Sequence, residues 1–156
     1  MCCNGVLFYS VRLQSADSVR QLDKLGLKIK RRSDGLHMLQ PCTAHTGSSC
    51  RVYAHRPERC RLFSCRQILR VEAGEASEGE ALENIETASR LTACVKELLE
   101  KVGDTREHKA LATRYETALT PPLDPAASSA REALASAMAE LEDFLAREFR
   151  TENAPS

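Results

Sequence analysis

The sequence lacks tryptophan and contains few other aromatic residues, with three tyrosines and four phenylalanines among its 156 residues. So few large apolar side chains limit the core that the chain can build, above all in its N-terminal third. A small region with a thin core often depends on a metal ion or a covalent cross-link for its stability. No apolar run approaches the length of a membrane span, so we expect no membrane partner.

The first residues, Met1–Gly5, contain neither the basic stretch nor the apolar stretch of a secretory signal. We therefore expect a cytoplasmic protein, whose cysteines stay reduced and serve as ligands or redox groups. Six of the seven cysteines fall within the first 65 residues, and these six are Cys2, Cys3, Cys42, Cys50, Cys60 and Cys65. Such crowding of thiols predicts that a metal ion holds them as thiolates.

The net charge of zero conceals a division of charge along the chain. Residues 1–70 carry 13 Lys and Arg against 4 Asp and Glu, a net charge of +9, and residues 71–156 carry −9. A basic half can bind nucleic acid, or it can offset buried negative charge such as that of a zinc ion with four thiolates. The arginines that directly adjoin cysteines are Arg51, Arg59, Arg61 and Arg66. This pattern favours arginines that surround thiolates and hold the thiol pKa values down over a nucleic-acid partner. A nucleic-acid or protein adaptor that uses the basic half stays as an alternative.

The patterns predict an α+β fold with a small, cysteine-rich, metal-stapled α+β unit over residues 1–70 and a helical part over residues 80–150. Residues 71–79 are predicted to link the two parts, and residues 151–156 to form a disordered tail. The first unit is expected to contain a strand over 6–13, a helix capped by Ser15 and stopped by Gly26, and a hairpin turning at Asp34-Gly35. A polar loop between Cys42 and Cys50, an extended segment at 51–53 and a short helix beginning at Pro57 and carrying Cys60 should follow.

Three helices are expected in the second part. The first spans 80–102, with an apolar face of Leu82, Ile85, Leu91, Val95, Leu98, Leu99 and Val102. Cys94 falls on this face and is predicted to be a core cysteine rather than a ligand. The second helix should begin at the capping pair Asp104 and Glu107, place His108 on its exposed side, and end at Pro121-Pro122. The third should begin at Ser129 and Glu132 and bury Leu134, Met138, Leu141, Leu145 and Phe149.

The spacing of the cysteines is only moderately specific for zinc. None of the gaps is the two-residue gap of a zinc knuckle or ribbon; the gaps are Cys42-x7-Cys50, Cys50-x9-Cys60 and Cys60-x4-Cys65. Neighbouring side chains of an extended chain point to opposite faces, so Cys2 and Cys3 rarely serve one ion together. His45 and His55 lie among the cysteines, where each either completes a coordination shell or is a solvated loop histidine.

The run Cys50-Arg-Val-Tyr-Ala-His-Arg-Pro57-Glu-Arg-Cys60-Arg-Leu-Phe-Ser-Cys65 resembles the bacterial cysteine-cluster proteins of the YkgJ type, which are described as zinc- or iron-chelating. Cys2-Cys3 is similar to the last pair of the opening C-x-x-C-x-x-C-C cluster of that family, and Cys42 to its middle cysteine. The resemblance covers residues 1–65. The two cysteines that precede the pair in the family do not occur in this sequence, which leaves the number of metal ions open.

These observations predict a metal-chelating protein that binds zinc through thiolates drawn from Cys2, Cys3, Cys42, Cys50, Cys60 and Cys65. An iron–sulfur cluster held by the same cysteines is the first alternative, because four thiolates serve both kinds of centre. A thiol-redox or modifying enzyme is a further alternative, and the resemblance also implies protein methylase activity for some family members. The helical part is expected to be scaffold or a surface for a protein partner.

Overall fold

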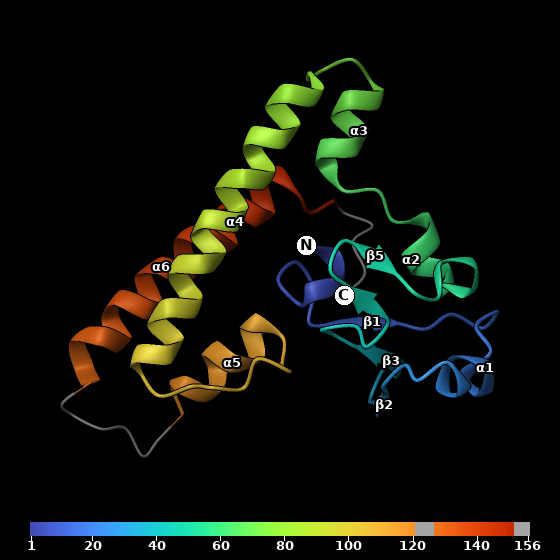
Figure 1. The fold of residues 1–156 in the computed structure, drawn as a ribbon, viewed down its shortest axis with the longest axis horizontal. Coiled ribbons are helices and arrows are strands. Elements are labelled where there is room, and N and C mark those ends of the chain that lie inside the picture. The colour runs from blue at the N-terminus through green and yellow to red at the C-terminus, as the bar shows by residue number, and fades with distance from the viewer. Residues whose placement is uncertain (121–126, 152–156) are drawn as a thin grey trace. The chain divides into compact units, whose positions relative to one another are not determined.

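The computed structural model describes residues 1–120 and 127–151 of the chain, and it confirms the predicted α+β class (Figure 1). The chain divides into two compact units. The first comprises Met1–Phe63 together with His108–Ala110, and the second comprises Ser64–Glu107 and the described residues from Leu111 onward. No helix within the described ranges combines the length and the apolar character that a membrane crossing requires.

A three-stranded antiparallel sheet forms the centre of the first unit. Its strands are β1 (Ser10–Arg12), β2 (Ile29–Arg32) and β3 (Gly35–Leu39), and β3 lies between the other two. The predicted hairpin at Asp34-Gly35 is confirmed, because β2 and β3 pair from Arg32 opposite Gly35 onward. The strand predicted over residues 6–13 is shorter than expected and is confined to β1. Residues 6–8 are buried without joining the sheet.

A short helix, α1 (Val19–Lys24), follows β1. Its N-cap is Ser18, whose hydroxyl oxygen accepts a 3.4 Å hydrogen bond from the backbone N–H of Gln21. The predicted cap at Ser15 is therefore wrong. Ser18 directly precedes the helix, so its side chain, and not that of Ser15, reaches the backbone N–H of Gln21 in the first turn. The predicted stop at Gly26 is confirmed, because this glycine adopts a φ of 79° just past the helix.

The segment that carries the cysteines is built from very short elements. These are the 3-10 helix η1 (Cys2–Asn4), the strands β4 (His45–Thr46) and β5 (Ser49–Cys50), the 3-10 helix η2 (Tyr53–His55) and the helix α2 (Glu58–Leu62). The expected polar loop thus contains a small antiparallel hairpin. The expected extended segment at 51–53 is instead a turn that leads into η2, while the helix after Pro57 is confirmed.

The second unit is helical. It contains α3 (Arg66–Glu72), α4 (Glu78–Lys101), α5 (Leu111–Ala118) and α6 (Ser128–Glu148), and Figure 1 shows α4 and α6 as the two long helices lying against each other. Helix α3 was not predicted from the sequence. Helix α4 begins with a capping box in which Ser77 and Glu80 satisfy each other's backbone N–H groups.

The buried face of α6 matches the prediction, whereas that of α4 matches it only at Val95 and Leu99. Leu134, Met138, Leu141, Leu145 and Phe149 are all buried. In α4 the buried residues are Ala81, Ala88, Thr92, Val95 and Leu99. Small alanines let another helix approach closely, so the contact line follows them rather than the larger Leu82 and Ile85, which are exposed. The same rotation of the buried face leaves Cys94 exposed, so the prediction of a core cysteine is wrong.

Two predicted helix starts are also wrong. Helix α5 begins only at Leu111, and Asp104 instead accepts hydrogen bonds from the Nε atoms of Arg114 at 2.8 Å and Arg106 at 2.6 Å. Burial acts to raise the pKa of the Asp104 carboxyl, but the hydrogen bonds from these two arginines outweigh it, so this pKa is lowered. Helix α6 begins at Ser128 without a side-chain cap, which overturns the cap expected at Ser129. The predicted stop at Pro121-Pro122 and, of the tail predicted over 151–156, residues 152–156 lie outside the described residues.

Candidate metal centre

Four cysteines of the first unit share one apolar cluster. Cys42 belongs to the cluster, and Cys3, Cys50 and Cys60 pack against it. We call these four residues the thiol quartet. The other buried members of the cluster are Val11, Leu22, Leu27, Met38, Ala44 and Val52. Four short segments, namely η1, the segment after β3, β5 and α2, therefore bring one thiol each to the same region, and only η1 is distant in sequence from the other three.

The position of Cys3 depends on its neighbour Gly5 and on Cys42. The backbone N–H of Cys42 donates a 2.8 Å hydrogen bond to the carbonyl oxygen of Cys3. Gly5 ends η1 with a φ of 77°, and a Cβ atom there would lie 3.0 Å from Cα of Ala110 and 3.2 Å from the ring of Pro41. Only glycine fits both this backbone conformation and this close approach, so the start of the chain is fixed against the segment that carries Cys42.

Cys42 and Cys50 are held together by the β4–β5 hairpin. The carbonyl oxygen of Cys42 accepts a 3.0 Å hydrogen bond from the backbone N–H of His45. His45 in turn lies opposite Cys50 in the register of the two strands. The hairpin thus returns the chain from Cys42 to Cys50 within a few residues.

Cys60 is brought to the quartet by α2. The backbone N–H of Glu58, in the first turn of α2, donates a 2.8 Å hydrogen bond to Asp17 Oδ1. The other carboxylate oxygen of Asp17 accepts a 2.8 Å hydrogen bond from the backbone N–H of Gln14. Asp17 therefore caps a helix that is far away in sequence and ties it to the segment after β1. This capping contact has no signal in the local sequence of either segment.

The surroundings of the quartet raise the pKa values of its thiols. Burial raises the pKa of Cys60 to about 12, and the proximity of Cys3 and Cys42 contributes to the increase. Burial also raises the pKa of Cys3, with a further contribution from Cys50, and it raises the pKa of Cys42. The positive charge of Arg56 lowers the pKa values of Cys3 and Cys60, but burial outweighs it. The expectation that arginines hold the thiol pKa values down is therefore wrong.

Of the four arginines that adjoin cysteines in the sequence, two make hydrogen bonds to backbone carbonyl oxygens and one is exposed. Arg51 donates to the carbonyl oxygen of Thr43 at 2.8 Å, Arg61 is exposed, and Arg66 of the second unit donates to the carbonyl oxygen of Arg147. Arg56 differs from these. Its Nε donates a 3.2 Å hydrogen bond to the carbonyl oxygen of Tyr53, and its guanidinium carbon lies 3.8 Å from the centre of the Tyr53 ring. These two contacts hold a positive charge close to the quartet.

The remaining cysteines occupy different surroundings. Cys2 lines a cavity together with three members of the quartet, whereas Cys65 is half-buried at the N-cap of α3 in the second unit. No disulfide joins Cys3, Cys42, Cys50, Cys60, Cys65 or Cys94, all of which lie within the described residues. In residues 1–120 and 127–151, no three His, Cys, Asp or Glu side chains are placed as ligands around one point.

The histidines near the cysteines also differ in their exposure and in their neighbours. His45 is half-buried and lines the same cavity as Cys2, whereas His55 is exposed and lies 3.4 Å from the side-chain amide of Gln21. His108 is exposed as expected, but it lies in a turn rather than in a helix. His45 is therefore the histidine best placed to replace or supplement a thiolate ligand.

His37 belongs to a hydrogen-bonded chain that the sequence did not reveal. Its Nδ1 lies 3.1 Å from Ser10 Oγ, and its Nε2 lies 3.0 Å from Asp34 Oδ1. A hydrolase triad contains the same three residue types, but its serine contacts Nε2 and its aspartate Nδ1, the reverse of the arrangement here. Only 1% of Ser10 and 2% of His37 is exposed, so this hydroxyl also cannot meet a substrate. The chain of hydrogen bonds instead joins β1 to β3 and to the turn that precedes β3.

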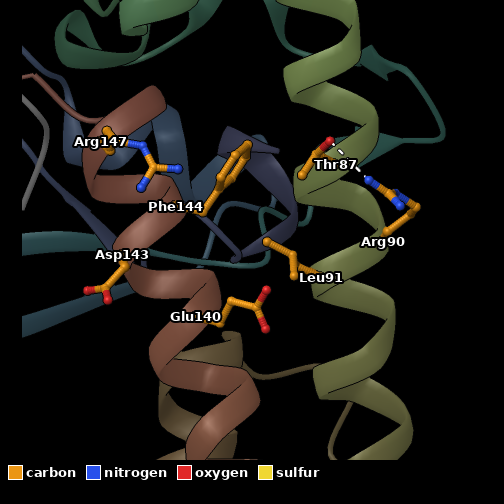
Figure 2. A pocket seen from close by; sticks show the side chains of 7 residues that line it. All are labelled: Thr87, Arg90, Leu91, Glu140, Asp143, Phe144 and Arg147. Carbon is orange, nitrogen blue, oxygen red and sulfur yellow. Dashed lines mark hydrogen bonds between the residues drawn. The ribbon is translucent and has the colours of Figure 1, made fainter.

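Two cavities differ in the chemistry that they offer. The cavity beside the quartet has a volume of about 670 Å³ and belongs to the first unit. A second cavity of about 540 Å³ lies between α4 and α6 (Figure 2). Arg90 there donates to Thr87, and Arg147 donates to Glu148 and lies over the ring of Phe144. Its two arginines thus already have partners, and two acidic residues balance their charge, so we place the candidate site at the quartet.

Comparison of the chain with protein-family models, with curated proteins and with solved structures gave no match. The functional argument therefore depends on the residues of the first unit.

Proposed function

We propose that the chain is a metal-binding protein and that the thiol quartet, Cys3, Cys42, Cys50 and Cys60, holds one zinc ion. The observation that carries the proposal is the convergence of four cysteines from four separate segments on a single cluster. Four thiolates are a complete tetrahedral set for zinc. Binding would require the four side chains to turn toward a common point, with backbone positions that the β4–β5 hairpin and the Cys3–Cys42 hydrogen bond already hold near one another.

The raised pKa values argue against thiol-redox catalysis. A redox-active cysteine needs a lowered pKa, because the thiolate is the nucleophile. The pKa values of Cys3, Cys42 and Cys60 are all raised, so these thiols are neutral near pH 7. A bound zinc ion deprotonates its thiol ligands outright, and the positive charge of Arg56 would offset part of the negative charge that results.

An iron–sulfur cluster would use the same four ligands, so the experiment must distinguish a zinc ion from such a cluster.

We also propose that the chain works in the cytoplasm, since reduced thiols persist in that compartment. The resemblance of residues 1–65 to the YkgJ-type proteins supports a chelating role, and it remains part of the proposal. The helical unit would then serve as scaffold or as a surface for a protein partner.

Metal analysis of the full chain, purified under reducing conditions without added metal, tests the proposal. We expect about one equivalent of zinc per chain and a colourless sample. Broad absorption at about 400 nm would instead indicate iron bound to thiolates. A sample that contains neither metal, and that takes up no zinc in a chelator competition, would overturn the proposal.

Chelation provides a structural readout of the same proposal. When a metal site does not exist in the unfolded chain, the free energy of metal binding stabilises the folded state. Removal of zinc should therefore reduce the far-UV circular dichroism only in part, because the first unit loses order while α4 and α6 persist. An unchanged spectrum would contradict a stabilising role for the ion.

A further inference from the structure

The cavity beside the thiol quartet has the dimensions of a small-molecule site. Its volume of about 670 Å³ falls within the range of pockets that enclose organic ligands. Phe8, Val11 and Phe63 supply an apolar wall, and the rings of Phe8 and Phe63 meet edge to face with their centres 5.1 Å apart. A metal ion alone would leave most of this volume unfilled.

The cavity also carries positive charge that nothing in its wall offsets. Arg56 and Arg59 line it, and no Asp or Glu is among the described residues that line it. The side chain of Arg59 makes no hydrogen bond or ion pair within the part of the chain that the structure describes. Two guanidinium groups beside an apolar wall are a typical arrangement for binding the head of an organic anion, and their planar fork matches a carboxylate.

We infer that this cavity binds a small organic carboxylate that has an apolar body. The carboxylate is held by Arg56 and Arg59, and the apolar body lies against Phe8 and Phe63. This inference goes beyond the proposed function, because none of these contacts requires a metal ion.

Isothermal titration calorimetry of the full chain with N-acetyl-L-phenylalanine tests the inference, because this probe carries both a carboxylate and an apolar body. The control ligand is N-acetyl-L-phenylalaninamide, which has nearly the same shape but no negative charge. Both are titrated into the same preparation of reduced protein as purified, so any bound metal affects the two ligands alike. We expect the acid to bind at least about tenfold more tightly than the amide, as charge-assisted hydrogen bonds to arginine predict. Equal affinities, or no binding of either ligand, would overturn the inference, and this comparison needs no variant.

A matched pair of variants locates the binding. Arg59→Gln should weaken binding of the acid by about tenfold, because it removes a guanidinium from the wall. Arg61→Gln removes the same charge from the same helix, but Arg61 is exposed and does not line the cavity. The affinity of this variant for the acid should therefore equal that of the wild type. Equal losses in both variants would show that only the overall charge attracts the acid and would refute the site. Zinc content is measured on separate samples, so a failure of the metal proposal leaves these results intact.

Discussion

The backbone N–H of Cys42 donates a 2.8 Å hydrogen bond to the carbonyl oxygen of Cys3. This contact joins the start of the chain to the segment that follows β3, and it places two of the four proposed ligands on neighbouring backbones. The two residues are far apart in sequence, so the contact exists only when the first unit is folded. Metal binding and folding of this unit are therefore expected to depend on each other.

The cysteines should differ in their effect on metal content. Cys60→Ser and Cys3→Ser should each remove most of the bound zinc, because a hydroxyl group is a poor zinc ligand. Cys94→Ser should leave zinc content unchanged, because this cysteine is exposed on α4. Cys65→Ser should retain most of the zinc, since four thiolates of the first unit already complete a tetrahedral set. Metal analysis of the four variants checks the prediction, and zinc loss in Cys65→Ser as large as in Cys60→Ser would refute the quartet.

Substitution of Arg56 tests whether its planar guanidinium matters beyond its charge. Arg56→Lys keeps the positive charge but loses the stacking on Tyr53 and the fixed hydrogen bond to the Tyr53 carbonyl oxygen. We expect the affinity for zinc to fall by about tenfold, a typical loss when a group that supports the ligands is changed. Arg61→Lys is the control, because Arg61 is exposed, and it should retain the wild-type affinity. Chelator competition measures both, and an unchanged affinity in Arg56→Lys would refute this role.

Two glycines with nearly the same backbone conformation should respond differently to alanine. Gly5 has a φ of 77° and Gly26 a φ of 79°, but only Gly5 has heavy atoms within contact range of an added Cβ. Gly26→Ala should lower the free energy of unfolding by about 1 kcal/mol, the cost of a left-handed conformation for alanine. Gly5→Ala should lower it by more than that and should also reduce zinc affinity, because it displaces the segment that carries Cys3. Urea titrations that gave equal losses for the two variants would show that packing at Gly5 contributes nothing.

Asp104 should make the stability of the helical unit depend on pH. The arginines beside it lower the pKa of its carboxyl in the folded state, so the folded state binds fewer protons than the unfolded state. The resulting stabilisation is present above the unfolded pKa of about 4 and is lost as the pH falls through the lower folded value. Asp104→Asn should remove this dependence and lower the free energy of unfolding at pH 7 by about 3 kcal/mol, because Arg114 remains buried with no carboxylate beside it. Urea titrations at several pH values from 7 to 3 measure both effects.

The prediction requires that protonation of Asp104 causes the loss of stability at low pH. Arg106→Gln provides the comparison, because Arg106 is partly exposed while Arg114 is buried. We expect Arg106→Gln to cost much less stability than Arg114→Gln. A wild-type and an Asp104→Asn protein that lose stability in parallel below pH 5 would contradict the assignment.

The sequence by itself determined the features that depend on local periodicity and on turn chemistry. The spacing of Leu134, Met138, Leu141 and Leu145 places them on one side of a helix, whatever packs there. The Asp34-Gly35 pair likewise predicted the hairpin, since its turn geometry is set by the residues themselves. The division of charge and the crowding of cysteines were also evident without coordinates.

Tertiary structure alone decided which of these residues meet. The buried face of α4 follows Ala81 and Ala88 rather than Leu82 and Ile85, because close helix packing favours small side chains over the most apolar ones. The cap that Asp17 provides for α2 and the grouping of four cysteines arise from contacts between distant segments, which no local pattern encodes. The sign of the thiol pKa shifts was decided in the same way. Arg51 and Arg66, which adjoin cysteines in sequence, donate to backbone carbonyl oxygens instead. Burial outweighs the charge of Arg56, which lies close to the quartet without adjoining a cysteine.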